Sequence, residues 1–265
     1  MSRPQREPPP AGTPPGVLTS LALGWLAMAP QLVAYEWGLA QTGGVVRNTG
    51  ERLALLALAP LGEWVSWVRW AVIAAGCCAA AALTRARGAR LGAGVARVVL
   101  EGIGLAIVLG PALVILLSLA SGWLPRLDSS WEPRGPPPLD TAALLFGGAA
   151  WEELCFRVGG YGIAYLLART MLGALGAGPR ASALAAEGVG LAGSSLVFAL
   201  AHLRAFTSWL GPGGAEFDPA LFTWLVAGGI LLGLIFRLRG PGVAAWTHGL
   251  FNVALLVGVD PDVLL

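Results

Sequence analysis

Several apolar runs of membrane-spanning length dominate this sequence of 265 residues. A helix needs about 20 apolar residues to cross the hydrocarbon core of a bilayer, and the run from Val98 to Leu124 is long enough. Within a bilayer a separate segment can bond all of its backbone groups only as a helix. Composition agrees, because 56% of the residues are hydrophobic and 12% are charged, whereas soluble domains carry about 25% charge. We therefore predict an all-α fold, a polytopic transmembrane helical bundle.

The chain divides into a tail, a set of accessory spans and a core that carries the chemistry. Residues 1–16 are polar and rich in proline, so we predict a disordered tail. Residues 17–140 would form accessory transmembrane spans, and residues 141–260 a catalytic helical core. The short apolar segment Leu53–Gly62 is either an interfacial lead-in or an eighth span. The other predicted spans, about seven, cover residues 17–40, 64–83, 98–124, 141–167, 184–203, 220–236 and 243–259.

Arginine supplies every fixed positive charge on the side chains, because the chain has no lysine. With seven spans and the N-terminus in the cytoplasm, ten arginines fall on cytoplasmic segments and five on the opposite side. This asymmetry follows the positive-inside rule and favours that orientation. A composition rich in alanine and glycine without lysine is typical of a GC-rich bacterial genome. We therefore expect an integral protein of the bacterial inner (plasma) membrane.

The segment Trp151–Arg157 places three ionisable side chains inside an apolar run. Each charge at the centre of a bilayer costs about 2.5–3.5 kcal/mol on insertion scales, so a functional site is the default hypothesis. Glu153 and Arg157 are four residues apart and can pair along one helix. Glu152 points about 100° away from Glu153, and we expect it to face a cavity. Glu36, near the end of the first span, is instead expected to reach the membrane interface.

The chain has two histidines, His202 and His248, and each lies in an apolar run. Phe198 precedes His202 by four residues and Asn252 follows His248 by four, a spacing that puts each pair on one helical face. Taken singly, each of these groups also has a structural interpretation, as an interhelical hydrogen-bonding partner. We predict that the three runs bring them, together with Glu152, to one site.

The ordered set of motifs resembles the CPBP family of intramembrane proteases, which includes the type II CAAX prenyl endopeptidases. The motifs are EExxxR at Glu152, Glu153 and Arg157, FxxxH at Phe198 and His202, and HxxxN at His248 and Asn252. The resemblance covers roughly residues 141–259. It implies hydrolysis of a peptide bond within the membrane.

Two versions of the chemistry are open at this stage. In the first, Glu152 takes a proton from a water molecule held by His202, and His248 and Asn252 stabilise the developing oxyanion. Glu153 would orient the site together with Arg157. In the second, His202, His248 and Glu152 bind zinc, since two histidines and a carboxylate form a known catalytic zinc set.

Substrate class follows from the resemblance alone. It implies a membrane protein or peptide, cleaved near a lipidated end or, as in the myxosortases, near a C-terminal sorting tail. No nucleic acid is expected as a partner.

A proton-coupled transporter also uses intramembrane charges, but the sequence has no internal repeat that would support it. A non-catalytic partner or immunity protein on the same fold is the other alternative, and the completeness of the motifs speaks against it.

Overall fold

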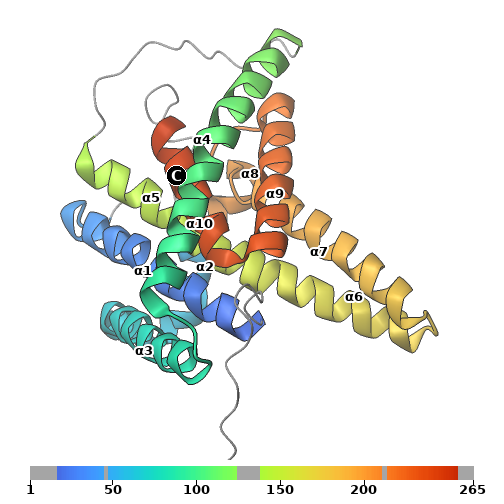
Figure 1. The fold of residues 1–265 in the computed structure, drawn as a ribbon. Coiled ribbons are helices and arrows are strands. Elements are labelled where there is room, and N and C mark those ends of the chain that lie inside the picture. The colour runs from blue at the N-terminus through green and yellow to red at the C-terminus, as the bar shows by residue number, and fades with distance from the viewer. Residues whose placement is uncertain (1–16, 45–46, 124–137, 211–213, 256–265) are drawn as a thin grey trace, which may run out of the picture.

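A computed structural model describes residues 17–44, 47–123, 138–210 and 214–255, which form a bundle of helices (Figure 1). The all-α prediction is confirmed: these residues hold no β-strand, only an isolated bridge between Leu203 and Ala215. The tail predicted at residues 1–16 lies outside the described residues. The elements are α1 (Val17–Gln41), α2 (Thr49–Leu58), η1 (Ala59–Trp64), α3 (Val65–Ala86), α4 (Leu91–Trp123), α5 (Leu139–Glu152), η2 (Glu153–Tyr161), α6 (Gly162–Ala174), α7 (Pro179–Leu200), α8 (Arg204–Thr207), η3 (Ser208–Leu210), α9 (Pro219–Arg239) and α10 (Pro241–Leu255).

Five segments of the described chain are long and apolar enough to cross a membrane. They agree with five of the predicted spans, and the lead-in at Leu53–Gly62 is helical as α2 and η1 and continues into α3. The other two predicted spans coincide with α5, η2 and α6 and with α10. The five segments that are long and apolar enough are Val17–Gln41, Thr49–Ala86, Leu91–Leu113, Pro179–Leu200 and Pro219–Arg239.

Helix α10 lies at the centre of the bundle, packed against α1, α4, α5 and α9 (Figure 1). It also contacts η2, which follows α5 directly. Helices α6 and α7 pack on each other and extend away from α1 and α3. This arrangement puts the three helices that carry the sequence motifs, α5, α7 and α10, around one region.

Local sequence signals explain where several of these helices begin. Pro179, Pro219 and Pro241 each occupy the first position of a helix, where the missing N–H is not needed. The side chains of Asn48 and Asp218 accept hydrogen bonds from the first turns of α2 and α9 and so cap them. Helix α2 therefore has a fixed start, which becomes important at the site.

The close approach of α1 to α5 depends on Gly147. A Cβ atom at this position would lie 2.4 Å from the carbonyl oxygen of Gln31 and 2.6 Å from Cβ of Tyr35. Small residues at such crossings let helix backbones approach closely in membrane proteins. Helix α1 and the chain that follows it are thereby held against the end of α5 that carries Glu152.

The run predicted as one α-helical span over residues 141–167 is interrupted by a π-helical segment, η2. At its end the N–H of Gly162 bonds to the carbonyl of Arg157, five residues back. Such segments are rare and often occur at functional sites. The α-helical spacing argument for Glu153 and Arg157 is therefore only approximate, because both residues lie in a wider helix.

A buried ionic cluster joins α1, α2 and α3, and it corrects the expectation for Glu36. This side chain is buried and is ion-paired with Arg69 of α3 rather than reaching the interface. Arg69 also pairs with Glu51 of α2, whose carboxylate accepts a hydrogen bond from Tyr35 at 2.8 Å. We call Tyr35, Glu36, Glu51 and Arg69 the Arg69 cluster. A carboxylate with a buried cationic partner does not need water to compensate its charge.

Candidate active site

Glu152 is the last residue of α5, and its carboxylate has polar neighbours from three other parts of the chain. Oε1 accepts a hydrogen bond from Nδ2 of Asn48 at 2.5 Å and lies 3.7 Å from Nε2 of His202. Oε2 lies 3.3 Å from Nε2 of His248 and has no hydrogen-bond partner in the described structure. The residue is 1% exposed. Glu152 thus lies beside both histidines, but the cavity that it was predicted to face does not include it among its lining residues.

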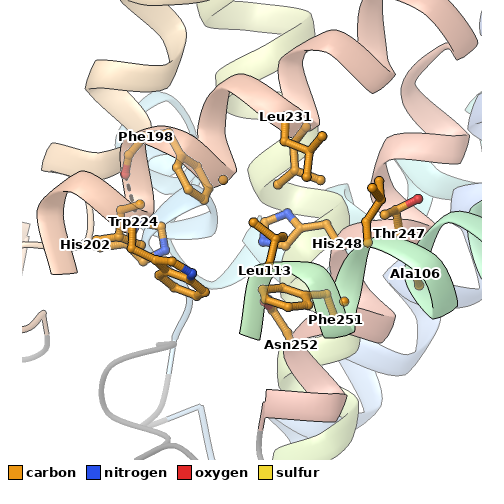
Figure 2. A pocket seen from close by; sticks show the side chains of 15 residues that line it. Ala106, Leu113, Phe198, His202, Trp224, Leu231, Thr247, His248, Phe251 and Asn252 are labelled. Carbon is orange, nitrogen blue, oxygen red and sulfur yellow. Dashed lines mark hydrogen bonds between the residues drawn. The ribbon is translucent and has the colours of Figure 1, made fainter. Parts of the chain in front are cut away.

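Both histidines present Nε2 to Glu152 because their other ring nitrogen is already engaged. Nδ1 of His202 lies 2.8 Å from the carbonyl oxygen of Phe198, as the dashed line in Figure 2 shows. Nδ1 of His248 lies 3.0 Å from Oε1 of Glu153. A carbonyl and a carboxylate can only accept, so both Nδ1 atoms carry hydrogen. In a neutral ring this leaves Nε2 as an acceptor.

Three acceptors therefore converge: the Glu152 carboxylate and the two Nε2 atoms. Acceptors that face one another inside a protein need a hydrogen between them, because a buried polar atom without a partner is costly. A shared proton, or a water molecule that donates to two of the groups, meets this need. The geometry around Oε2 of Glu152 therefore leaves this oxygen free to accept a hydrogen bond.

The predicted ion pair of Glu153 and Arg157 is present, but its two charged groups are too far apart for a hydrogen bond. Oε2 of Glu153 and Nε of Arg157 are 3.6 Å apart, and both side chains are completely buried. The guanidinium carbon also lies 4.9 Å from the centre of the Phe198 ring, within range of a cation–π interaction. The other oxygen of Glu153 orients His248, a contact that the spacing along the sequence does not indicate.

The ring of Phe198 lies close to three side chains of the site, those of Arg157, His202 and His248. Its ring centre lies 4.6 Å from that of His202 and 5.7 Å from that of His248. The FxxxH spacing therefore serves two purposes: the carbonyl fixes the tautomer of His202, and the ring packs between the histidines and Arg157.

His202 was predicted to lie within the fifth span, residues 184–203, but the structure places it just after the end of helix α7. Helix α7 ends at Leu200, and the carbonyl of His202 accepts a hydrogen bond from the N–H of Ala215 at 2.8 Å. This bridge to the following loop turns the chain and fixes the backbone of His202. The predicted alignment of Phe198 and His202 nevertheless holds, since the ring still bonds to the carbonyl four residues back.

A mainly apolar pocket opens beside the two histidines (Figure 2). Asn252 lines it one turn after His248, and Trp224 and Phe251 contribute aromatic walls. Helices α4, α7, α9 and α10 supply the lining, so the pocket lies between spans. Such a pocket suits an apolar ligand whose polar group lies at the histidine end.

Asn48 is the site residue that sequence reasoning missed. Its position before Thr49 and three residues ahead of Glu51 is typical of a helix start, and it does cap α2. Nothing in that local pattern indicates a contact with Glu152, which is 104 residues away.

Comparison with known families decides the wider assignment. Residues 134–254 match the family model described as type II CAAX prenyl endopeptidase Rce1-like. This segment is a CAAX protease domain. The matched range contains every predicted site residue, and the CAAX protease domain is in general terms an intramembrane endopeptidase. No curated protein and no solved structure matches the chain. Asn48 and the Arg69 cluster lie outside the matched range.

Proposed function

We propose that this protein is an intramembrane endopeptidase in which Glu152 activates a water molecule. The observation that carries the proposal is the convergence of the Nε2 atoms of His202 and His248 on the Glu152 carboxylate, at 3.7 and 3.3 Å. The apolar pocket beside them supplies a place for a membrane-embedded substrate segment. The site thus combines a buried proton acceptor with an apolar binding surface.

In the proposed reaction Glu152 takes one proton from water while the water oxygen attacks the peptide carbonyl carbon. His202, held through Nδ1, would orient the water through Nε2. The proton then passes to the amide nitrogen as the C–N bond breaks, which releases an amine and a carboxylic acid that ionises by giving up the second proton of the water. General acid–base catalysis of this kind contributes about 10²–10⁴-fold in rate.

The oxyanion would be stabilised by Asn252 and His248. Asn252 donates through its side-chain amide, whereas His248 donates only when Nε2 carries hydrogen, because Nδ1 is already committed to Glu153. Glu152 lies 3.3 Å from that Nε2, so the proton it gains from water can be shared with His248. Donors aimed at developing charge in a site that excludes water are worth more than in solution.

Replacement of Asn252 by alanine is expected to lower kcat by about 10²–10³-fold with little change in KM. The physical reason is that one oxyanion donor is lost, and such donors act in the transition state. The check is steady-state kinetics of purified protein in proteoliposomes. A rise in KM with unchanged kcat would instead place Asn252 in substrate binding.

Two probes test the proposal directly. One is a quenched fluorogenic peptide whose cysteine, three residues from the C-terminus, carries a farnesyl group, as the name of the matched family suggests. The other joins the same fluorogenic sequence to a C-terminal transmembrane helix. Cleavage of either probe by proteoliposomes supports the proposal, and mass spectrometry of the products locates the bond. Failure of folded protein to cleave both probes would contradict it.

The side chains around Glu152 are of the types that bind zinc, although their present arrangement does not form such a site. Glu152, His202 and His248 would hold the ion, since a histidine that donates through Nδ1 and keeps Nε2 free is in the state that binds metal. Bound zinc would supply Lewis-acid activation of water. Within the described residues no group of three or more His, Cys, Asp or Glu side chains was found that could hold a metal ion.

We expect cleavage of the probe to survive exhaustive chelation, because Glu152 and the histidines provide a proton acceptor and a water-orienting group by themselves. The measurement is the initial rate after dialysis against 1,10-phenanthroline, with metal content determined on the same sample. Loss of activity that zinc restores, and magnesium does not, would assign the three residues as ligands instead.

A further inference from the structure

We propose that Asn48, from the segment ahead of the CAAX protease domain, is the positioning residue of Glu152. Its Nδ2 donates to Oε1 of Glu152 at 2.5 Å, while its Oδ1 accepts from the N–H of Gly50 at 2.8 Å. The two neighbours fix the amide orientation, because the N–H can only donate and the carboxylate accepts. The inference rests on the proposed role of Glu152 as the base.

Asn48 is itself held from both sides. Its backbone N–H donates to the hydroxyl of Tyr35 at 2.8 Å, and that hydroxyl donates to Glu51 of the Arg69 cluster. Asn48 is 2% exposed, so bulk water does not replace its amide. A rigid donor of this kind is expected to select one rotamer of the carboxylate.

The backbone of α2 also lies directly against Glu152. A Cβ atom at Gly50 would lie 3.0 Å from Cα and N of Glu152, and Sγ of Cys155 donates to the carbonyl of Gly50 at 3.0 Å. The start of α2 and the end of α5 are thus in contact through main-chain atoms. This contact leaves little freedom for Asn48 to move away from the carboxylate.

With Oε1 bonded to Asn48, the proton-accepting position is Oε2. That oxygen faces His248 and lacks a hydrogen-bond partner among the described residues. Asn48 therefore acts through Glu152 by directing one oxygen to the reacting water. It does not touch the substrate pocket, whose lining does not include it.

Two variants separate this role from capping. Serine and aspartate are both good N-cap residues, so Asn48→Ser and Asn48→Asp keep the start of α2 but remove the amide donor. Asp218→Ala removes the cap of α9 and is the matched control for a loss of capping, since the side chain of Asp218 bonds, among the described residues, to its own helix start. Glu152→Gln is measured beside them.

With a probe that the wild-type protein cleaves, both Asn48 variants are expected to lose about 10–100-fold in kcat, as is typical when an outer partner of a site residue is removed. KM should stay within about twofold, because substrate binding does not involve Asn48. Asp218→Ala should keep the wild-type kcat. If Glu152→Gln is inactive while both Asn48 variants keep kcat within about twofold, the positioning role is wrong and the proposed function stands. If Glu152→Gln stays active, the proposed function itself fails.

An infrared measurement tests the contact without a substrate. The difference spectrum between wild type and Glu152→Gln identifies the C–O stretching band of Glu152. This band is expected to shift in Asn48→Ser, because the carboxylate oxygen loses a charge-assisted hydrogen bond. A band at the wild-type frequency in Asn48→Ser would overturn the proposal even if the variant were inactive for another reason.

Discussion

Replacement of Glu152 by glutamine should reduce cleavage by at least about 10³-fold while leaving the fold intact. Glutamine has the same shape, and its carbonyl oxygen can still accept the hydrogen bond from Asn48. It cannot take a proton from water, so general-base catalysis is lost. The measurement is the single-turnover rate on a cleaved probe, together with the thermal unfolding midpoint in detergent.

Glu187→Gln is the matched control for this experiment. Glu187 lies on α7, bonds to Arg237 at 2.8 Å and has no contact with the site. Its replacement should therefore leave the cleavage rate unchanged. If Glu152→Gln retains more than about a tenth of the wild-type rate, Glu152 is not the base and a different water-activating group must be sought.

Replacement of Arg69 by methionine should lower the free energy of unfolding by about 3–5 kcal/mol. The change leaves the buried carboxylate of Glu36 without its ion-pair partner and leaves Glu51 with Arg47 alone, and a buried charge that loses its counter-ion is strongly destabilising. The guanidinium also lies 5.1 Å from the Trp151 ring, so a cation–π contact is lost as well. Thermal unfolding of purified protein in detergent measures the effect.

A double variant makes this prediction more specific. Glu36→Gln combined with Arg69→Met should be less destabilised than the sum of the two single changes, because the glutamine removes one of the uncompensated charges. Arg237→Met is the control, since its ion pair with Glu187 is partly exposed and should contribute at most about 1 kcal/mol. Equal losses in Arg69→Met and Arg237→Met would show that burial of the Arg69 cluster does not matter for stability.

The fold class and the presence of the long helices were predictable because their signals are local. Apolar runs, first-turn prolines and capping residues act within a few positions, so the sequence indicates them directly. The motifs on three runs also predicted which residues meet around Glu152. In each case the prediction depended on spacing along one helix or on ionisable groups that are costly within an apolar run.

The parts that sequence reasoning missed depend on contacts between distant segments. Asn48 carries the pattern of a helix start, and its second role appears only when α2 meets α5. The burial of Glu36 requires Arg69, which lies two helices later. The π-helical winding of η2 likewise has no local signal that we recognise. These features follow from tertiary packing rather than from propensity.

The Arg69 cluster has a consequence for how the chain enters the membrane. Glu36 and Glu51 are synthesised before Arg69, so Glu36 lacks its ion-pair partner until α3 leaves the ribosome, whereas Glu51 can already pair with Arg47, which lies 2.6 Å from it in the folded protein. A carboxylate without a partner opposes insertion by about 2.5–3.5 kcal/mol at the centre of a span and by less near its end, where Glu36 lies, and the partner of Glu36 comes from a later segment. Helices α1, α2 and α3 are therefore expected to partition into the bilayer as one unit. Glu152 lies on α5, which is synthesised after α3. Asn48 can therefore dock against Glu152 only after α3 and α5 have both been synthesised.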